Sequence, residues 1–183
     1  GASAPECSLV DQAMTTATQI EEVWALLEQL TDPEIPVISL RELGILREIR
    51  DTDTGLEVVI TPTYSGCPAM EQIEADVRGL LAEQGITAKV TTRLSPAWTT
   101  DWMTDEGKEK LRQYGIAPPV HKVSDVAVMK FMPGAAQRKA EVVPCPQCGS
   151  HQTVESAHFG STACKALYRC LDCQETFDYF KPY

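Results

Sequence analysis

Apolar residues recur at helical spacing in two long stretches of the chain. The first stripe runs from Ile20 to Leu30, and Asp32-Pro33 is expected to end that helix, because the residue before a proline is disfavoured in helical backbone. A second stripe runs from Met70 to Leu81. Pro68 is expected in the first turn of this helix and Gly85 just after its last turn, which are the positions that these residue types favour.

Alternating and β-branched segments predict strands between these helices. Glu34 to Leu40 contains prolines and β-branched residues and is expected to be extended. Gly44 to Arg50 and Leu56 to Thr61 flank the polar turn Asp51 to Gly55, which predicts a hairpin. Thr87 to Leu94 alternates and is expected to form a third strand.

A third helix completes one small domain. Thr104 to Tyr114 begins with a capping hydroxyl and acidic residues, and Gly115 follows it. The order α-β-β-α-β-α predicts an α/β (α+β) sandwich at residues 18–117. The pattern is lost in residues 118–142, which we interpret as a linker or docking segment, and residues 143–183 are predicted to form a small all-β ribbon.

The charge of the chain is concentrated in the first domain. Residues 1–116 hold 20 acidic and 9 basic side chains, and the whole chain has a net charge of −10. This acidity argues against non-specific binding to nucleic acid, although it also serves plain solubility. We see no membrane helix, and Gly1 to Asp11 lacks the features of a signal peptide. Together with the paired cysteines described next, which suit a reducing compartment, this predicts a cytoplasmic protein.

Four cysteines near the C-terminus have the spacing of a metal site. They form two C-x-x-C turns separated by 21 residues, and a hairpin between such turns brings the four thiolates together. A structural zinc ion is therefore predicted on Cys145, Cys148, Cys170 and Cys173, where it would contribute much of the folding free energy of a zinc ribbon. Iron is one alternative, and four reduced cysteines packed as small apolar residues are another.

A fifth cysteine and the histidines have less definite roles. Cys164 lies six residues before the second pair. We interpret it either as a buried packing residue or as a thiol that reaches another site. His121, His151 and His158 lack paired spacing with any carboxylate, so they are interpreted as surface residues.

Cys67 stands apart from the other cysteines, between a predicted strand and a predicted helix. Backbone N–H groups at a helix N-terminus stabilise a thiolate, and neighbouring hydroxyl groups, such as that of Tyr64, add donors. A reactive thiol is expected here, with a structural thiol beneath the turn as the alternative. No histidine lies in the first 120 residues and no general base is evident, so no catalytic residue is predicted and the chain is not expected to be an enzyme.

A ligand role suits Cys67 better than a nucleophilic one. A resident iron–sulfur cluster is usually held by four cysteines, so a single cysteine would hold a cluster weakly or share it. This favours a carrier of a transient cluster, and sharing favours a homodimer. Asp32 and Glu34 are candidate ligands beside the same loop. Their alternative roles are helix termination and simple solvation.

Several segments resemble a known family. Asp32 to Val37, Leu43 to Ile45 and Ser65 to Pro68 resemble the α/β domain of SufT-type iron–sulfur maturation factors. Four further segments, together with the ribbon cysteines, are similar to the PaaD (or PaaJ) family. These segments are Ser95 to Thr104, Tyr114 to Pro119, Phe159 to Cys170 and Phe177 to Lys181. Glu42 is a mild departure, because SufT-type domains commonly carry an aspartate at this position before Leu-Gly.

The resemblance implies an accessory function in aerobic phenylacetate degradation. The PaaD family serves the bacterial phenylacetyl-CoA epoxidase, which combines a di-iron oxygenase core with a flavin and iron–sulfur reductase. The SufT-like domain implies iron–sulfur cluster assembly or insertion, with the reductase as the implied client. In this hypothesis Cys67 handles cluster material and the ribbon docks the client. Trp98, Trp102 and Met103 then form part of a contact surface, or else they belong to the core.

Two other functions stay open at the level of the sequence. A non-catalytic interaction subunit would bind and stabilise the epoxidase components, with every cysteine structural. An electron-transfer protein would hold iron in the four-cysteine ribbon. Visible absorption distinguishes the latter, because zinc sites are colourless.

Overall fold

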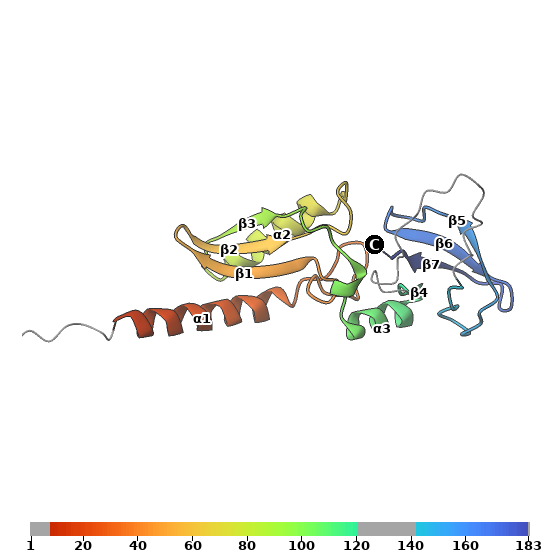
Figure 1. Cartoon of the computed structure of the whole chain (residues 1–183), viewed down its shortest axis with the longest axis horizontal. Coiled ribbons are helices and arrows are strands. Elements are labelled where there is room, and N and C mark those ends of the chain that lie inside the picture. Colours follow the sequence, from red (N-terminus) through yellow and green to blue (C-terminus); the bar gives the residue numbers. More distant parts are fainter. Residues whose placement is uncertain (1–7, 121–141, 183) are drawn as a thin grey trace, which may run out of the picture.

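The computed structural model describes residues 8–120 and 142–182, and side chains from residue 18 onward. An α/β domain and a β-ribbon lie end to end along the longest axis of the molecule (Figure 1). Most of the predicted linker at 118–142, including His121, lies outside the described residues. No helix in the described part of the chain is both long and apolar enough to cross a membrane.

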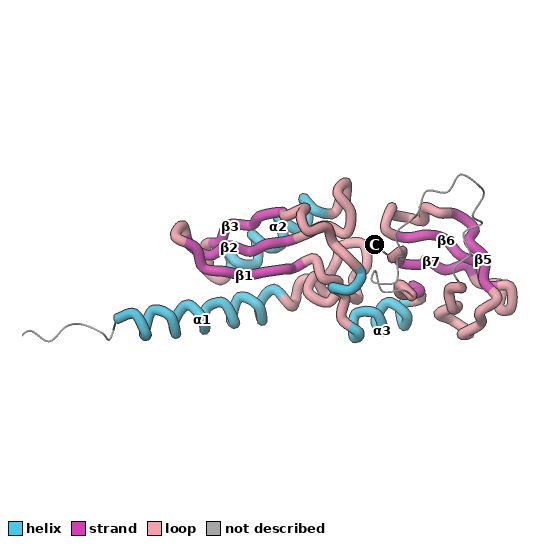
Figure 2. Tube along the Cα trace, viewed as in Figure 1, coloured by secondary structure: helices cyan, strands magenta, loops and turns pink. Residues whose placement is uncertain are grey.

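The α/β domain has the predicted order of helices and strands. Its sheet has the order β1-β2-β3, with β1 antiparallel to β2 and β3 parallel to β2. The predicted hairpin is therefore confirmed, and α2 forms the crossover between the two parallel strands (Figure 2). The elements are α1 (Ser8–Leu27), β1 (Leu46–Thr52), β2 (Gly55–Ile60), α2 (Met70–Glu83), β3 (Ala88–Thr92), the short η1 (Thr100–Trp102) and α3 (Asp105–Tyr114).

Two helices close the core of this domain. Helix α1 packs on β1, α2 packs on β3, and the two helices contact each other. The apolar stripes predicted in the sequence supply the buried side chains, because every third or fourth residue of a helix faces the sheet. From the helices these include Val23, Leu27, Ile73, Val77 and Leu81.

The second sheet joins the ribbon to the end of the α/β domain. Its order is β4-β7-β6-β5, and the strands are β4 (Ile116–Ala117), β5 (Thr153–Ala157), β6 (Lys165–Cys170) and β7 (Thr176–Phe180). Strand β4 directly follows α3 in the chain, yet it pairs in parallel with β7 of the ribbon. The sequence pattern does not predict this strand, because two residues are too short to show an alternation.

The connection between α1 and β1 differs from the prediction. Helix α1 ends at Leu27, and Glu34 to Leu40 forms turns rather than an extended segment. The Asp32 carboxylate causes the change, since its Oδ1 accepts the backbone N–H groups of Glu34 and Ile35, each at 2.9 Å. An aspartate that hydrogen-bonds the backbone two and three residues ahead closes a turn and competes with extended structure.

The starts of α2 and α3 differ in their agreement with the prediction, and only α3 has a side-chain cap. Helix α2 begins at Met70, so Pro68 lies before its first turn and not within it. Helix α3 begins as predicted, because the Thr104 hydroxyl accepts the backbone N–H of Gly107 at 3.0 Å. It ends at Gly115, whose φ of 92° places it in the left-handed region that glycine tolerates.

Two of the three residues proposed for a contact surface belong to the core instead. Trp98 and Met103 are each 4% exposed. The Trp98 indole N–H donates to the Leu43 carbonyl at 3.0 Å, and its ring centroid lies 5.8 Å from that of Phe180 in the ribbon. Trp102 is partly buried, with the Arg47 guanidinium 3.5 Å from its ring centroid. The contact-surface hypothesis is therefore wrong for Trp98 and Met103.

Candidate metal and thiol sites

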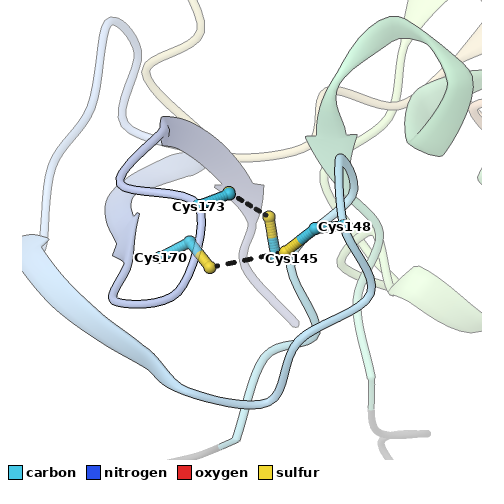
Figure 3. A group of neighbouring side chains, drawn as sticks. All are labelled: Cys145, Cys148, Cys170 and Cys173. Carbon is cyan, nitrogen blue, oxygen red and sulfur yellow. Dashed lines mark hydrogen bonds between the residues drawn. The ribbon is translucent and has the colours of Figure 1, made fainter.

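The two C-x-x-C turns of the ribbon face each other (Figure 3). Backbone hydrogen bonds shape each turn: Gly149 N–H donates to the Cys145 carbonyl and Cys170 N–H to that of Glu175, both at 2.9 Å. Gly149 has a φ of 73° and Gln174 a φ of 66°, so each turn ends in the left-handed conformation. The backbone thereby points two side chains of each turn toward the same space.

The four sulfur atoms have the arrangement that a tetrahedral metal ion requires. All four lie within 4.8 Å of one another. Cys145 Sγ lies 3.8 Å from Cys173 Sγ, and Cys148 Sγ lies 3.6 Å from Cys170 Sγ. A zinc ion bonded to four thiolates at about 2.3 Å sets its sulfurs about 3.8 Å apart. The residues present therefore fit a zinc tetrathiolate.

The electrostatics of the second turn affect its two cysteines in opposite directions. Backbone N–H groups of Cys173 and Asp172 hold the pKa of Cys170 at about 7, below that of an ordinary cysteine. Although the Glu175 N–H acts in the opposite direction, burial and the neighbouring cysteine side chains raise the pKa of Cys173 to about 12. The thiolate is the form that binds a metal. This turn thus presents a thiolate to an incoming cation without the help of a histidine or lysine.

Cys67 lies in the segment between β2 and α2, at the end of the α/β domain that faces the ribbon (Figure 1). Strand β2 runs toward the ribbon, so the residues that follow it reach this end of the domain. The Cys67 N–H donates to the Tyr64 carbonyl at 3.2 Å, and the Ala69 N–H hydrogen-bonds the thiol. Cys67 is half-buried and packs against the hydrophobic core of its domain.

The surroundings of Cys67 do not stabilise its thiolate. Burial raises the pKa of the Cys67 thiol, and the hydrogen bond from the Ala69 N–H opposes that effect. The negative charges of Glu34 and Asp32 raise the pKa further. The expected reactive thiolate is therefore not what the structure shows, because desolvation and two carboxylates outweigh one backbone donor.

Asp32 and Glu34 both lie close enough to Cys67 to act on its charge. Asp32 is buried, and that burial raises the pKa of its carboxyl although two backbone N–H groups and the charge of Lys165 act in the opposite direction. Burial and the charge of Asp32 raise the pKa of the partly exposed Glu34. The turn that replaces the predicted extended segment thus places both carboxylates where their negative charge acts on the thiol.

The structure adds Cys164, to which the sequence pattern assigns no definite role. Cys164 lies between β5 and β6 of the ribbon, is 5% exposed, and belongs to the hydrophobic cluster of the α/β domain. Its charge acts on Cys67, and the charges of Glu34 and Asp32 act on it. The odd position of Cys164 before the second C-x-x-C turn is the only signal in the sequence.

The two histidines that the structure describes, His151 and His158, lie on the surface as expected. His158 Nδ1 lies 3.1 Å from the Glu155 carboxylate, and its backbone carbonyl accepts a hydrogen bond from Lys181. Neither histidine belongs to the four-cysteine cluster.

Family models match both parts of the chain. A model described as iron–sulfur cluster assembly protein matches residues 20–91. A second model, described as PaaD zinc beta ribbon domain, matches residues 132–181. The first match ends within β3 and the second begins at residue 132, so neither model covers α3 or β4.

Known proteins resemble the whole chain and its first half. The chain is 46% identical over 164 residues to a "Putative 1,2-phenylacetyl-CoA epoxidase" component of Escherichia coli K12, which covers 89% of this chain and 93% of that protein. It is 31% identical over 94 residues to an Fe-S protein maturation auxiliary factor of Porphyromonas gingivalis, with 50% of this chain and 89% of that protein covered. A crystal structure of a DUF59 domain from Bacillus anthracis covers 54% of this chain and 96% of its own, with 25% identity and a TM-score of 0.50.

Proposed function

This chain belongs to the PaaD family of phenylacetyl-CoA epoxidase components, and we propose that it is an accessory maturation factor of that epoxidase system. Its role is the assembly or insertion of an iron–sulfur cluster, and its client is the iron–sulfur flavin reductase. We assign it no catalytic residue. Its partners are components of the epoxidase in the cytoplasm.

One observation carries the proposal: an iron–sulfur assembly domain presents a half-buried thiol beside two carboxylates, at the end that meets a PaaD ribbon. The thiol, Cys67, lies in a loop and not in the sheet, so a client can approach it. A match to the assembly model alone would not indicate which protein receives the cluster. The ribbon, which matches the PaaD family, connects that chemistry to the epoxidase.

The environment of Cys67 suits a ligand that holds its cargo briefly. Its raised pKa keeps the thiol protonated until a cation approaches. Binding of iron then releases the proton, so affinity falls steeply as the pH falls. Asp32 and Glu34 supply negative charge and oxygen ligands in the same place. A cluster held in this way would leave more readily than one held by four thiolates.

The ribbon has a structural part in this proposal. Cys145, Cys148, Cys170 and Cys173 would hold one zinc ion, which supplies folding free energy to a sheet with little core of its own. Zinc does not change its redox state, so this site would carry no electrons. The ribbon is then free to act as the surface that docks the client.

The test is the metallation of the client. Cys67→Ala, produced together with the epoxidase components in a host without a related protein, is expected to yield a reductase that lacks most of its iron and sulfide. The zinc content and the unfolding temperature of the variant should match those of the wild type. Cys7→Ala, which removes a cysteine to which we give no role, is the control and should leave the reductase fully metallated.

A reductase with its full cluster in the Cys67→Ala background would overturn the proposal. It would instead favour a non-catalytic subunit that stabilises the epoxidase assembly. The burial of Cys164 and the raised pKa of Cys67 favour this second function, since both are also expected of structural thiols. Stoichiometric co-purification with the mature epoxidase, combined with indifference to the loss of Cys67, would identify it.

A further inference from the structure

A small cavity lies at one end of the sheet of the α/β domain, and no cysteine lines it. Its volume is about 160 Å³, and its lining residues are Arg47, Glu48, Thr61, Arg93, Pro96 and Trp102. One water molecule needs only about 10–15 Å³ of such space. The cavity therefore has room for a ligand group of several heavy atoms.

The strand directions place this cavity where α/β sheets bind ligands. Thr61 directly follows β2 and Arg93 directly follows β3, which are parallel strands whose carboxyl ends point toward the ribbon (Figure 1). Ligands of α/β proteins commonly lie outside the carboxyl ends of parallel strands. The Thr61 N–H donates to the Ile45 carbonyl at 2.8 Å. The Arg93 N–H donates to the Ile60 carbonyl, also at 2.8 Å. The backbone on this side of the cavity is thus held in place by the sheet.

An irregularity in β1 turns Arg47 toward the cavity. In the pairing of β1 with β2, Leu46 lies opposite Ile60 and Glu48 lies opposite Val59. Arg47 is therefore the extra residue of a β-bulge. Neighbouring residues of a regular strand point to opposite faces, yet Arg47 and Glu48 both line the cavity. A bulge re-aims a side chain in this way and is common beside active sites.

Trp102 supports the guanidinium group of Arg47. The guanidinium carbon lies 3.5 Å from the centroid of the Trp102 ring. The Trp102 N–H donates to the Thr99 carbonyl at 3.1 Å, which fixes the backbone of η1. A guanidinium that rests on an aromatic ring keeps the N–H groups at its edge available, and these form a fork that matches an oxyanion.

The charge of Arg47 has no counterpart in the described part of the chain. Burial lowers the pKa of the Arg47 guanidinium, and no neighbouring carboxylate opposes that effect. Other arginines are paired with a carboxylate, namely Arg41, Arg50, Arg78, Arg93 and Arg112. Acidic residues are not scarce, because residues 1–116 hold 20 acidic and 9 basic side chains. A bound anion would supply the missing charge.

The second arginine of the cavity is held only weakly by its own partner. Arg93 lies 3.4 Å from the Glu48 carboxylate, and the two side chains are 38% and 41% exposed. Glu48 also lies 3.7 Å from Arg50. Exposed ion pairs of this kind contribute little, so an anion can compete for Arg93. Two guanidinium groups face one carboxylate across the cavity, which leaves a net positive charge.

We propose that Arg47 and Arg93 form a binding site for the phosphate group of a small molecule. A tetrahedral phosphate has enough oxygen atoms to accept from both guanidinium groups, whereas a carboxylate matches a single fork. Pro96 and Trp102 offer apolar surface to the organic part of the ligand. A larger polyanion is disfavoured, because it would meet the acidic surface of the domain around the site.

Nuclear magnetic resonance of the zinc-loaded full-length protein tests this site. The indole N–H signal of Trp102, assigned with Trp102→Phe, is followed while sodium phosphate replaces sodium chloride at constant pH and ionic strength. A saturable shift is expected. Sodium acetate should bind more weakly than phosphate, and a phosphoserine peptide should bind no more tightly than phosphate.

Substitutions of the charged residues separate a specific site from general attraction. Arg47→Gln removes the fork and should weaken phosphate binding about tenfold or more. Arg47→Lys keeps the charge but should not restore the affinity, because an ammonium group has no fork. Glu48→Gln removes the competing carboxylate and should strengthen binding. Arg78→Gln, which removes an exposed charge paired with Glu74 on α2, is the matched control and should leave the affinity unchanged.

Several results would overturn the proposal. These are a shift that never saturates, equal phosphate affinity of wild type and Arg47→Gln, an equal loss in Arg78→Gln, and acetate or the peptide binding more tightly than phosphate. If circular dichroism shows that Arg47→Gln does not fold, the more exposed Arg93→Gln takes its place, and an unchanged affinity there would count against the site equally. The site does not involve Cys67, so its failure would leave the maturation function unaffected.

Discussion

At the scale of single residues, burial and charge decide what Cys67 can do. Its position before a helix predicts a stabilised thiolate, yet α2 begins three residues later and only the Ala69 N–H reaches the sulfur. Burial and the carboxylates of Asp32 and Glu34 then raise the pKa of the thiol. A sulfur in this state reacts slowly with electrophiles at neutral pH.

Alkylation of Cys67 should therefore be slow at neutral pH. Only the thiolate reacts, and its fraction falls tenfold for each pH unit below the pKa. The raised pKa predicts that the rate with iodoacetamide keeps rising above pH 9, where an ordinary cysteine levels off. Mass spectrometry of the Cys67 peptide measures the rate. An early plateau, near pH 7 or 8, would contradict this prediction.

The carboxylates provide a matched control for that experiment. Asp32→Asn and Glu34→Gln each remove one negative charge that raises the pKa of Cys67. Either variant should shift the pH profile of alkylation toward lower pH. Glu34→Gln is the cleaner change, because Asp32 also closes the turn through its bonds to Glu34 and Ile35.

At the scale of the elements, turns and close approaches position the sites more than the helices and strands do. Gly44, in the Leu43-Gly44-Ile45 segment before β1, has a φ of 77°. A Cβ at this position would lie 2.7 Å from the Trp102 carbonyl oxygen and 2.8 Å from Trp102 Cβ. The glycine allows the segment that starts the sheet to pack directly against η1.

Gly44→Ala should therefore destabilise the protein by about 3 kcal/mol, from the left-handed backbone and the clash with Trp102 together. Gly79, in the exposed middle of α2, is the control, because a Cβ there meets nothing within 4 Å. Gly79→Ala should stabilise the protein by about 0.5–1 kcal/mol. Urea unfolding followed by circular dichroism measures both changes in the free energy of unfolding. If Gly44→Ala leaves that free energy unchanged, the segment around Gly44 can shift away from Trp102 at little cost.

The elements also show where prediction from the sequence succeeds. The β1–β2 hairpin, α2 and α3 are predictable because periodicity, turn residues and caps all act within a few positions of the chain. The segment after Asp32 is harder to predict. The sequence indicates that a helix stops there, but it does not show that the carboxylate accepts two backbone N–H groups and closes a turn. The burial of Cys164 in the core of the α/β domain cannot be predicted either, because it depends on how the ribbon docks onto that domain.

At the scale of the whole molecule, the ribbon and the α/β domain share one core. Phe180 of β7 is 1% exposed and belongs to the same hydrophobic cluster as Leu27 of α1. Its ring packs against Trp98, and β4 pairs with β7 beside it. The ribbon is thus attached by apolar packing and by a strand, and the buried Cys164 lies within the shared core.

Because the core is shared, a destabilising substitution in the ribbon should also destabilise the α/β domain. Phe180→Ala removes a fully buried ring and should destabilise the protein by about 3–5 kcal/mol. Phe159→Ala removes a ring that is 66% exposed and contacts Lys181, and should cost less than about 1 kcal/mol. Tryptophan fluorescence, which includes Trp98, and circular dichroism should report one common transition that Phe180→Ala shifts to lower urea. A Phe180→Ala protein whose fluorescence transition stays in place would mean that the two domains unfold independently.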